Sequence, residues 1–196
     1  MRKKTFGIGI IGCGVIGQKR AKALGVGGRL VACADKDIHR AKSTASTSNA
    51  SAFEDWKVLL KVPEVEIVVI ATLHDSLAQI SLAAIKAGKH VLVEKPAARF
   101  AIELEPVIEA SEQKGIKVHV GFNHRYHQSL RKAREIIDSG KLGELMFIRA
   151  RYGHGARVGY DEEWRAKPEL SGGGELIDQG PHLVDLSRWF FGEFTE

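Results

Sequence analysis

The sequence predicts an α/β protein, in which a doubly wound parallel sheet is followed by the start of an incomplete α+β domain. Short runs rich in valine and isoleucine alternate with longer helical patterns, as expected for parallel strands joined by crossover helices. The run 67–70 is apolar at every position, which predicts a strand covered by helices on both faces. The alternation ends at Gly121, so we expect one domain over 1–121 and a partial second domain over 122–196.

The individual elements follow from local patterns in chain order. Short apolar runs predict strands at 6–11, 30–34, 67–71, 90–93 and 117–121, with a weakly marked strand at 51–53. The helical patterns between them predict helices at 16–24, 38–45, 54–61, 77–87 and 102–114. Beyond the boundary we expect a helix at 128–139, an apolar segment at 145–148, an aromatic and charged loop, and a glycine cluster at 172–174.

Composition restricts the function classes. The 196 residues are 44% hydrophobic and 27% charged, which is typical of a folded soluble protein. The formal charge is +5, but lysine and arginine are scattered among carboxylates, so we expect a surface that favours an anionic ligand and no nucleic-acid partner. Cys13 and Cys33 form neither a disulfide framework nor a metal-type pair, which fits a reducing cytoplasm. No apolar stretch reaches the roughly 18 residues of a membrane span, so no membrane partner is expected.

A glycine-rich motif lies between the first expected strand and the first expected helix. It follows the pattern G-x-G-x-x-G and consists of Gly12, Cys13, Gly14, Val15, Ile16 and Gly17. Gly12 permits a tight turn, Gly14 lets phosphates approach the backbone, and Gly17 lets the helix pack closely on the strand. Backbone N–H groups at the start of this helix favour a diphosphate, so the motif predicts a dinucleotide-binding domain of the Rossmann type.

Asp35 ends the second expected strand, about 20 residues beyond the last glycine of the motif, where a carboxylate binds the adenosine ribose. A carboxylate repels a 2′-phosphate, so NAD is the expected cofactor. Lys36 and Arg40 lie close enough to keep NADP open as an alternative. A simple cap of the strand end is the structural alternative for Asp35.

Three residues are candidates for the chemistry. Lys95 follows the strand at 90–93, at the sheet edge where open α/β sheets bind ligands, and Pro96 restrains its backbone; a surface charge is the alternative. In a continuous helix Asp178 and His182 share a face, and a carboxylate beside an imidazole suits proton removal from a hydroxyl. Pro181 leaves open that a helix starts there and that Asp178 is a cap.

The remaining aromatic and basic residues carry weaker signals. Trp164 and Arg165 offer an aromatic wall and a hydrogen-bonding fork to a sugar, with a packed tryptophan and a surface arginine as the alternative. His124 and His127 have a spacing compatible with a metal, but no cysteine or carboxylate cluster accompanies them, so no metal site is expected.

Together these motifs resemble the Gfo/Idh/MocA family of oxidoreductases, which includes glucose-fructose oxidoreductase and inositol dehydrogenase. The resemblance covers essentially the whole chain and is carried by the glycine motif, Asp35, Ala71-Thr72, the segment 87–96 with its Glu94-Lys95-Pro96, Gly121-Phe122-Asn123-His124-Arg125, and the segment 172–182. It implies hydride transfer to or from the hydroxyl of a sugar, cyclic polyol or nucleotide sugar.

The resemblance also implies roles for single residues. Lys95 would hydrogen-bond the reacting oxygen, His182 would act as the acid or base, and Asp178 would position both substrate and histidine. The dinucleotide site would also be lined by Thr72, Leu73, Glu94 and Asn123. Asn123 and Arg125 would border the substrate. His182 and, from their own chemistry, Trp164 and Arg165 are the further candidates for substrate binding.

Two features depart from the family pattern. The family usually has proline and asparagine after the threonine, where this chain has Leu73 and His74, which puts the cofactor contacts of that loop in question. Family members continue into a large antiparallel sheet that covers the substrate and mediates homo-oligomerisation, whereas this chain stops at Glu196. We therefore expect a shortened chain that leaves apolar residues uncovered, namely Trp189, Phe190, Phe191 and Phe194.

Two other functions stay open at this point. One is an NAD(P)-binding regulatory or sensor protein of the same fold, although a pure sensor has no need of Lys95, Asp178 and His182. The other is an NAD-dependent glycosidase, which would release a sugar without net formation of NADH.

Overall fold

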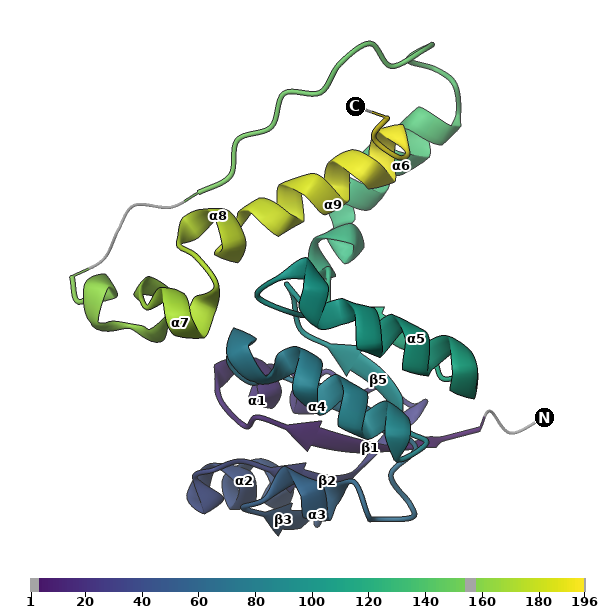
Figure 1. Cartoon of the computed structure of the whole chain (residues 1–196). Coiled ribbons are helices and arrows are strands. Elements are labelled where there is room, and N and C mark those ends of the chain that lie inside the picture. Colours follow the sequence, from purple (N-terminus) through teal and green to yellow (C-terminus); the bar gives the residue numbers. More distant parts are fainter. Residues whose placement is uncertain (1–3, 154–157, 196) are drawn as a thin grey trace. The chain divides into compact units, whose positions relative to one another are not determined.

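The computed structural model describes residues 4–153 and 158–195. The chain divides into two compact units, Met1–Gly121 and Phe122–Glu196. Figure 1 colours the chain from purple at the N-terminus, through the first unit, to yellow in the last helix of the second. Among the described residues, none of the helices combines the length and apolarity needed to cross a bilayer.

The first unit contains a six-stranded parallel sheet. Its strands are β1 (Phe6–Ile11), β2 (Gly28–Ala34), β3 (Ser51–Phe53), β4 (Ile67–Ile70), β5 (His90–Val93) and β6 (Val118–Val120). They lie in the order β3-β2-β1-β4-β5-β6, and every neighbouring pair is parallel. The order reverses between β1 and β4, and ligands of doubly wound sheets bind at the carboxyl ends of the strands beside this reversal. The predicted doubly wound α/β fold is confirmed.

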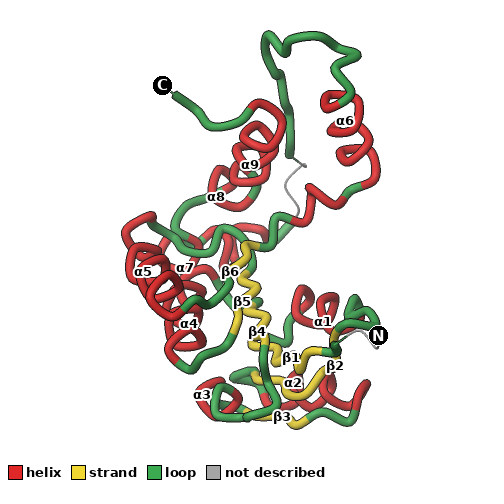
Figure 2. Tube along the Cα trace, turned by 90° about the vertical axis from the view of Figure 1, so that its right-hand side faces the viewer, coloured by secondary structure: helices red, strands yellow, loops and turns green. Residues whose placement is uncertain are grey.

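Two layers of helices cover this sheet. The helices are α1 (Val15–Lys22), α2 (Ile38–Ala45), α3 (Trp56–Leu59), α4 (His74–Lys86) and α5 (Glu105–Lys114). Figure 2 shows the yellow strands passing between α4 and α5 on one side and α1 on the other. Ile10 packs in the core with α1 and α2 and Ile11 packs in the core with α3, α4 and α5; these neighbours in β1 are both almost fully buried. Alternate residues of one strand thus serve both layers.

Several helices differ in extent from the sequence-based expectation. The helix expected over 102–114 consists of a 3₁₀ turn, η2 (Ala101–Leu104), and then α5, because Pro106 favours the first turn of an α-helix. The helix expected over 54–61 is only the single turn α3, which Asp55 caps through its side chain by accepting from the N–H of Lys57 at 2.9 Å. Helix α4 begins at His74, three residues earlier than expected.

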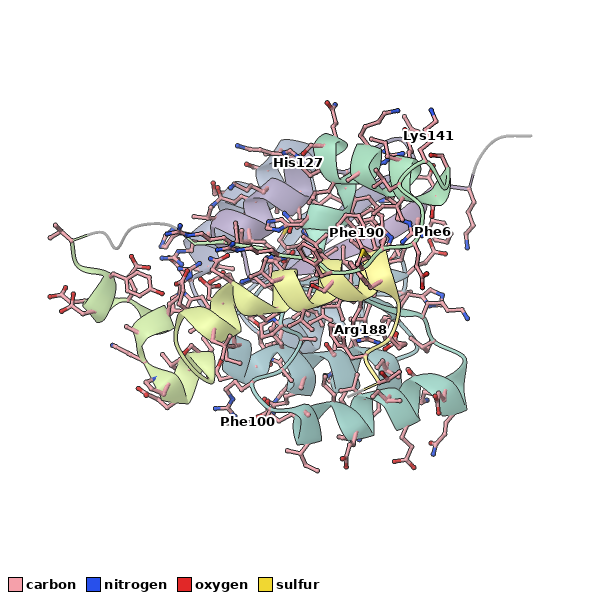
Figure 3. All side chains as sticks on the ribbon, turned by 90° about the horizontal axis from the view of Figure 1, so that it is seen from above. Phe6, Phe100, His127, Lys141, Arg188 and Phe190 are labelled. Carbon is pink, nitrogen blue, oxygen red and sulfur yellow. The ribbon has the colours of Figure 1, made fainter. Side chains whose placement is uncertain are left out.

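The second unit is helical over its described residues and contains no strand among them. Its elements are η3 (Asn123–Tyr126), α6 (Gln128–Asp138), η4 (Tyr160–Glu162), η5 (Trp164–Ala166), α7 (Pro168–Ser171), α8 (Glu175–Asp178) and α9 (Gly180–Phe191). Helices α6 and α9 lie side by side, and Arg134 of α6 donates to the carbonyl oxygen of Phe190 at 3.4 Å. Figure 3 labels Arg188 and Phe190 on α9, and His127 and Lys141 before and after α6.

The second unit leaves several apolar side chains exposed. Met146 and Phe147 are 90% and 80% exposed in a segment without regular secondary structure. Phe191 and Phe194, at and beyond the end of α9, are also exposed, whereas Trp189 and Phe190 are half-buried. Of the four aromatic residues expected to be uncovered, only Phe191 and Phe194 are therefore exposed.

Candidate functional site

The turn between β1 and α1 can be built only with glycine at two of its positions. Gly12 has a φ of +88°, and a Cβ there would lie 2.5 Å from the carbonyl oxygen of Ala71. A Cβ at Gly17 would lie 1.9 Å from the carbonyl oxygen of Gly12. Cys13 is fully buried and donates from Sγ to the carbonyl oxygen of Ala34 at 3.6 Å, which anchors the turn on β2. Both expectations for these glycines, a tight turn and close packing of the helix, match this geometry.

Gly14 has a different environment. It is the N-cap of α1, no side chain caps the helix, and a Cβ at this position would meet nothing within 4 Å. The first backbone N–H groups of a helix have no acceptor inside the helix, and the helix dipole is positive at this end. Val15, the next residue, is 71% exposed, so no large apolar group covers the helix start. The open space in front of Gly14 and the uncapped N–H groups fit a diphosphate.

Asp35 lies directly beside this turn. Its Oδ2 accepts a hydrogen bond from the backbone N–H of Cys13 at 2.7 Å, and its Oδ1 accepts from the N–H of Asp37 at 2.9 Å. Two backbone donors therefore orient the carboxylate, and each oxygen retains a lone pair for a further donor such as a ribose hydroxyl. Arg40 forms an exposed ion pair with Asp37 at 3.3 Å, and Lys36 is exposed.

The segment after β4 forms the neighbouring part of the same sheet edge. Ala71 donates from its N–H to the carbonyl oxygen of Ile11 at 2.8 Å, and Ser76 donates to the hydroxyl oxygen of Thr72 at 2.9 Å. Leu73 is the N-cap of α4, and its apolar side chain cannot accept a hydrogen bond from the first backbone N–H groups of this helix. The structure therefore brings together Thr72 and the glycine turn, since Gly12 contacts the Ala71–Thr72 backbone.

Lys95 follows β5 in a turn that the backbone closes. The peptide bond between Lys95 and Pro96 is cis, and the N–H of Ala97 donates to the carbonyl oxygen of Glu94 at 3.0 Å. Lys95 is half-buried and lies, as predicted, just past the carboxyl end of a central strand.

Glu94 has a partner that the sequence analysis missed. Arg20 of α1 donates from Nε to its Oε1 at 2.5 Å, and a Cβ on Gly121 would lie 3.2 Å from its Oε2. The side chains of Arg20 and Glu94 are only 26% and 14% exposed. The pair joins α1, which follows the glycine turn, to the turn that contains Lys95. The two residues are 74 positions apart, and no local sequence pattern around either one predicts the contact.

In the second unit, Asp178 and His182 belong to two different helices and therefore do not lie on one face of a single helix. Helix α8 ends at Asp178, Gln179 is the N-cap of α9, and Pro181 lies in the first turn of α9. The continuous-helix expectation is therefore wrong, because a proline favours a helix start and cannot donate the backbone hydrogen bond that continuation requires. Asp178 is not the N-cap either. Its Oδ2 lies 3.3 Å from Nε of Arg165 and accepts from Gln179 at 3.2 Å.

His182 lies in a cluster of aromatic rings. It is 4% exposed, and its ring stacks on that of His124 with a centroid separation of 3.9 Å and an interplanar angle of 18°. Phe122 and Tyr152 each form a T-shaped contact with the His182 ring, with a centroid separation of 6.2 Å. Sequence reasoning considered His124 only as a metal ligand and missed this contact. No group of three metal-binding side chains occurs within 4–153 and 158–195.

Arg125 is paired with a buried carboxylate of α9. Its Nε donates to Oδ2 of Asp185 at 2.8 Å and its Nη2 donates to Oδ1 at 2.6 Å. The hydrogen bond to Asp185 raises the pKa of the Arg125 guanidinium above its ordinary value, so the arginine stays charged. This pairing leaves three N–H donors of the guanidinium that could bind a substrate hydroxyl. That Arg125 borders the substrate stays a prediction.

The other predicted substrate residues lie around Asp178. The guanidinium of Arg165 lies 4.7 Å from the ring centroid of Trp164 and contacts Glu163 at 3.3 Å as well as Asp178. Trp164, Arg165 and Asp178 therefore form one cluster in the second unit. Asn123, the first residue of η3, is exposed.

Comparison with known proteins identifies the relatives of both units. Residues 6–122 match the model of an oxidoreductase family with an NAD-binding Rossmann fold (GFO_IDH_MocA), and residues 130–196 match the GFO/IDH/MocA C-terminal domain. The inositol 2-dehydrogenase of Rubrobacter xylanophilus is 34% identical over 197 residues, which cover 98% of this chain and 54% of that protein.

Solved structures agree with the sequence comparison. An oxidoreductase domain protein from Kribbella flavida superimposes with a TM-score of 0.87 at 31% identity and covers 96% of this chain and 53% of that one. A levoglucosan dehydrogenase in complex with NADH and L-sorbose gives a TM-score of 0.84 at 26% identity, with 97% of this chain and 54% of that one covered. The chain spans about half the length of the relatives it matches.

Proposed function

Since the chain belongs to the Gfo/Idh/MocA oxidoreductase family, we propose that it is the dinucleotide-binding and catalytic part of an NAD-dependent dehydrogenase acting on a sugar or cyclic polyol. The observation that carries the proposal is the uncapped start of α1 behind Gly14, with the oriented carboxylate of Asp35 beside it. Together they offer a site for a diphosphate and for a ribose at one edge of the sheet.

The residues of the first unit would hold the cofactor. The N–H groups at the start of α1 bind the diphosphate, Asp35 accepts from the ribose hydroxyls, and Thr72 and Glu94 line the site at the ends of the neighbouring strands β4 and β5. NAD, when bound, supplies the acceptor for the hydride of the substrate carbinol. Asp35 favours NAD over NADP because its negative charge repels a 2′-phosphate, and Arg40 is already paired with Asp37.

The chemical roles fall to three residues. Lys95 hydrogen-bonds the reacting oxygen and stabilises the negative charge that develops there. His182 takes the proton from the substrate hydroxyl in oxidation and returns it in reduction, because an imidazole titrates near neutral pH. Asp178, held by Arg165 and Gln179, positions the substrate.

The substrate class rests on the relatives. They include inositol 2-dehydrogenases and a levoglucosan dehydrogenase crystallised with L-sorbose, all of which are named for cyclic or sugar-like hydroxyl compounds. The half-buried Trp164–Arg165 cluster is suited to such a substrate, because a flat ring packs on the apolar face of a sugar and a guanidinium donates to its hydroxyls.

The first test is binding and turnover by the chain. We expect NAD to bind more tightly than NADP in a fluorescence titration, and NADH to form at 340 nm with at least one compound of a panel containing myo-inositol, levoglucosan and L-sorbose. Binding without turnover on any compound would favour a sensor function. Release of a free sugar from a glycoside without net NADH would favour a redox-assisted glycosidase.

Lys95→Ala tests the assigned chemistry. We expect kcat to fall by about 100-fold or more, because charge stabilisation at the reacting oxygen is lost, while the Kd for NAD changes little. Lys61→Ala, on the surface after α3, is the matched control and should leave both values unchanged. Equal activity of the Lys95 variant and the wild type would refute the role of Lys95.

A further inference from the structure

Two elements of the second unit, η3 and α9, are joined by two successive side-chain contacts. His124 and Arg125 are neighbours in η3, while His182 and Asp185 are three residues apart in α9 and so lie on the same helix face. His124 stacks on His182, and Arg125 binds Asp185 through both carboxylate oxygens. Two neighbouring residues of η3 thus contact two residues on one face of α9.

The ion pair fixes geometry in a way that an apolar contact does not. Two parallel hydrogen bonds of 2.8 and 2.6 Å set both the distance and the angle between guanidinium and carboxylate. The side chain of Asp185 is only 7% exposed, and replacing a buried ion pair by apolar residues is often neutral or stabilising. Such a pair is better explained by orientation than by stability. Trp189, one turn further along α9, lies 5.9 Å from the Arg125 guanidinium and confines it further.

The ring contacts restrict the histidine itself. The stack with His124 covers one face of the His182 ring, and the rings of Phe122 and Tyr152 form T-shaped contacts with it at interplanar angles of 78° and 89°. Rotation of the imidazole about its bond to Cβ would break these contacts. The surroundings therefore hold the plane of the His182 ring, and with it the direction in which its nitrogen atoms point.

We propose that Asp185, through Arg125, and His124, through its ring, are positioning residues that set the position of α9 and the plane of the His182 imidazole for proton transfer. The inference rests on the proposed function, in which His182 is the acid or base. It assigns the orientation of His182 to residues that the sequence analysis gave no such role, and it makes this orientation a property of the second unit alone.

The test uses five single variants of the chain, labelled with ¹³C and ¹⁵N in histidine for NMR. Asp185→Asn removes the ionic acceptor, His124→Ala removes the stack, and His124→Phe restores a flat ring without nitrogen atoms. His127→Ala is the matched control, because His127 is an exposed histidine of the same segment that contacts Ser129. His182→Gln assigns the His182 ring resonance.

We expect the His182 ring resonance to move in Asp185→Asn and His124→Ala and to stay in place in His127→Ala. With an accepted substrate, kcat should fall by about 100-fold in the first two variants, as for a catalytic group displaced by about 1 Å, with the Kd for NAD unchanged. His124→Phe should recover most of this loss, which a general destabilisation of the unit would not allow.

The inference and the proposed function can fail separately. If the wild type turns over and the Asp185 and His124 variants match it, the positioning role is refuted and the function stands. If the wild type binds NAD but turns over no substrate, the NMR comparison still decides: an unmoved His182 resonance in both variants refutes the inference, and a shift specific to them supports it. If Asp185→Asn does not fold, the pair His124→Ala and His124→Phe decides in its place.

Discussion

The two units hold their candidate residues by different means. In the first unit the backbone itself forms the candidate binding site, because the glycine turn fits only where Gly12 and Gly17 lack a Cβ. In the second unit side-chain contacts hold the candidate residues, namely the Arg125–Asp185 pair and the stack of His182 on His124. A site built from backbone is rigid and intolerant of substitution, whereas a site built from side-chain pairs can lose its geometry while the fold survives.

The difference also separates the proposed diphosphate binding from the proposed proton transfer. The backbone site offers N–H groups to a diphosphate, which needs many weakly directional donors. The side-chain site holds a histidine, which has to present one nitrogen atom in one direction. Three substitutions, taken in order of expected effect, would break or sharpen this comparison.

Gly17→Ala should have the largest effect. Its Cβ would lie 1.9 Å from the carbonyl oxygen of Gly12, and neither group can move without opening the turn. We expect the free energy of unfolding of the first unit to fall by at least about 3 kcal/mol, measured in urea. Gly14→Ala is the control, because its Cβ meets nothing: it should cost less than about 1 kcal/mol and yet raise the Kd for NAD about tenfold. Equal destabilisation by both variants would contradict the steric account.

Arg125→Leu should have an intermediate effect that stays within the second unit. It leaves the nearly buried Asp185 carboxylate without its arginine, and because Arg125 itself is 39% exposed, water offsets part of the loss. We expect a cost of about 2 kcal/mol, seen as faster amide hydrogen exchange in α9 with unchanged exchange in β1 and β4. Arg125→Lys, which keeps the charge but loses the fork, should fall between the wild type and Arg125→Leu.

Glu103→Gln should have the smallest effect, and it concerns a local contact of the first unit. Glu103 accepts from the N–H of Arg99 at 2.9 Å and from its Nη2 at 2.7 Å. Burial raises the pKa of Glu103, but the hydrogen bonds from Arg99 outweigh it, so the net pKa lies below the ordinary value of 4.5.

A carboxylate whose pKa is lower in the folded state stabilises the fold fully above the unfolded-state pKa and loses this contribution as the pH falls through the folded-state pKa. We expect Glu103→Gln to cost about 1 kcal/mol at pH 7 and to reduce the loss of stability between pH 5 and pH 3. Urea unfolding at several pH values measures both. An unchanged pH profile in the variant would show that Glu103 does not contribute as described.

The same contrast explains what could be predicted from sequence. The strands of the first unit, the glycine turn, Asp35 beside it and Lys95 past β5 all depend on residues close together in the chain and on the rules of parallel sheets. The Arg20–Glu94 and Arg125–Asp185 pairs join residues 74 and 60 positions apart, and no local pattern marks either partner.

The break between α8 and α9 depends on two competing local signals in the sequence and on no contact between distant residues. The sequence allowed both a continuous helix and a new start at Pro181, and the four-residue spacing of Asp178 and His182 favoured the wrong alternative. The proline is the stronger signal. Its missing N–H and its steric clash destabilise a continuous helix by more free energy than one favourable side-chain spacing contributes.

Every strand among the described residues precedes Gly121, so the sheet can form early during synthesis on the ribosome. Once that residue has left the exit tunnel, the sheet has every partner it requires. Helix α6 emerges soon afterwards but meets α9 only after about 50 more residues have been synthesised, some 3 to 11 seconds later at about 5 to 20 residues per second. During that interval the nascent chain holds a finished dinucleotide-binding sheet and an unpaired Arg125, so the first unit is available to its ligand before the second can assemble.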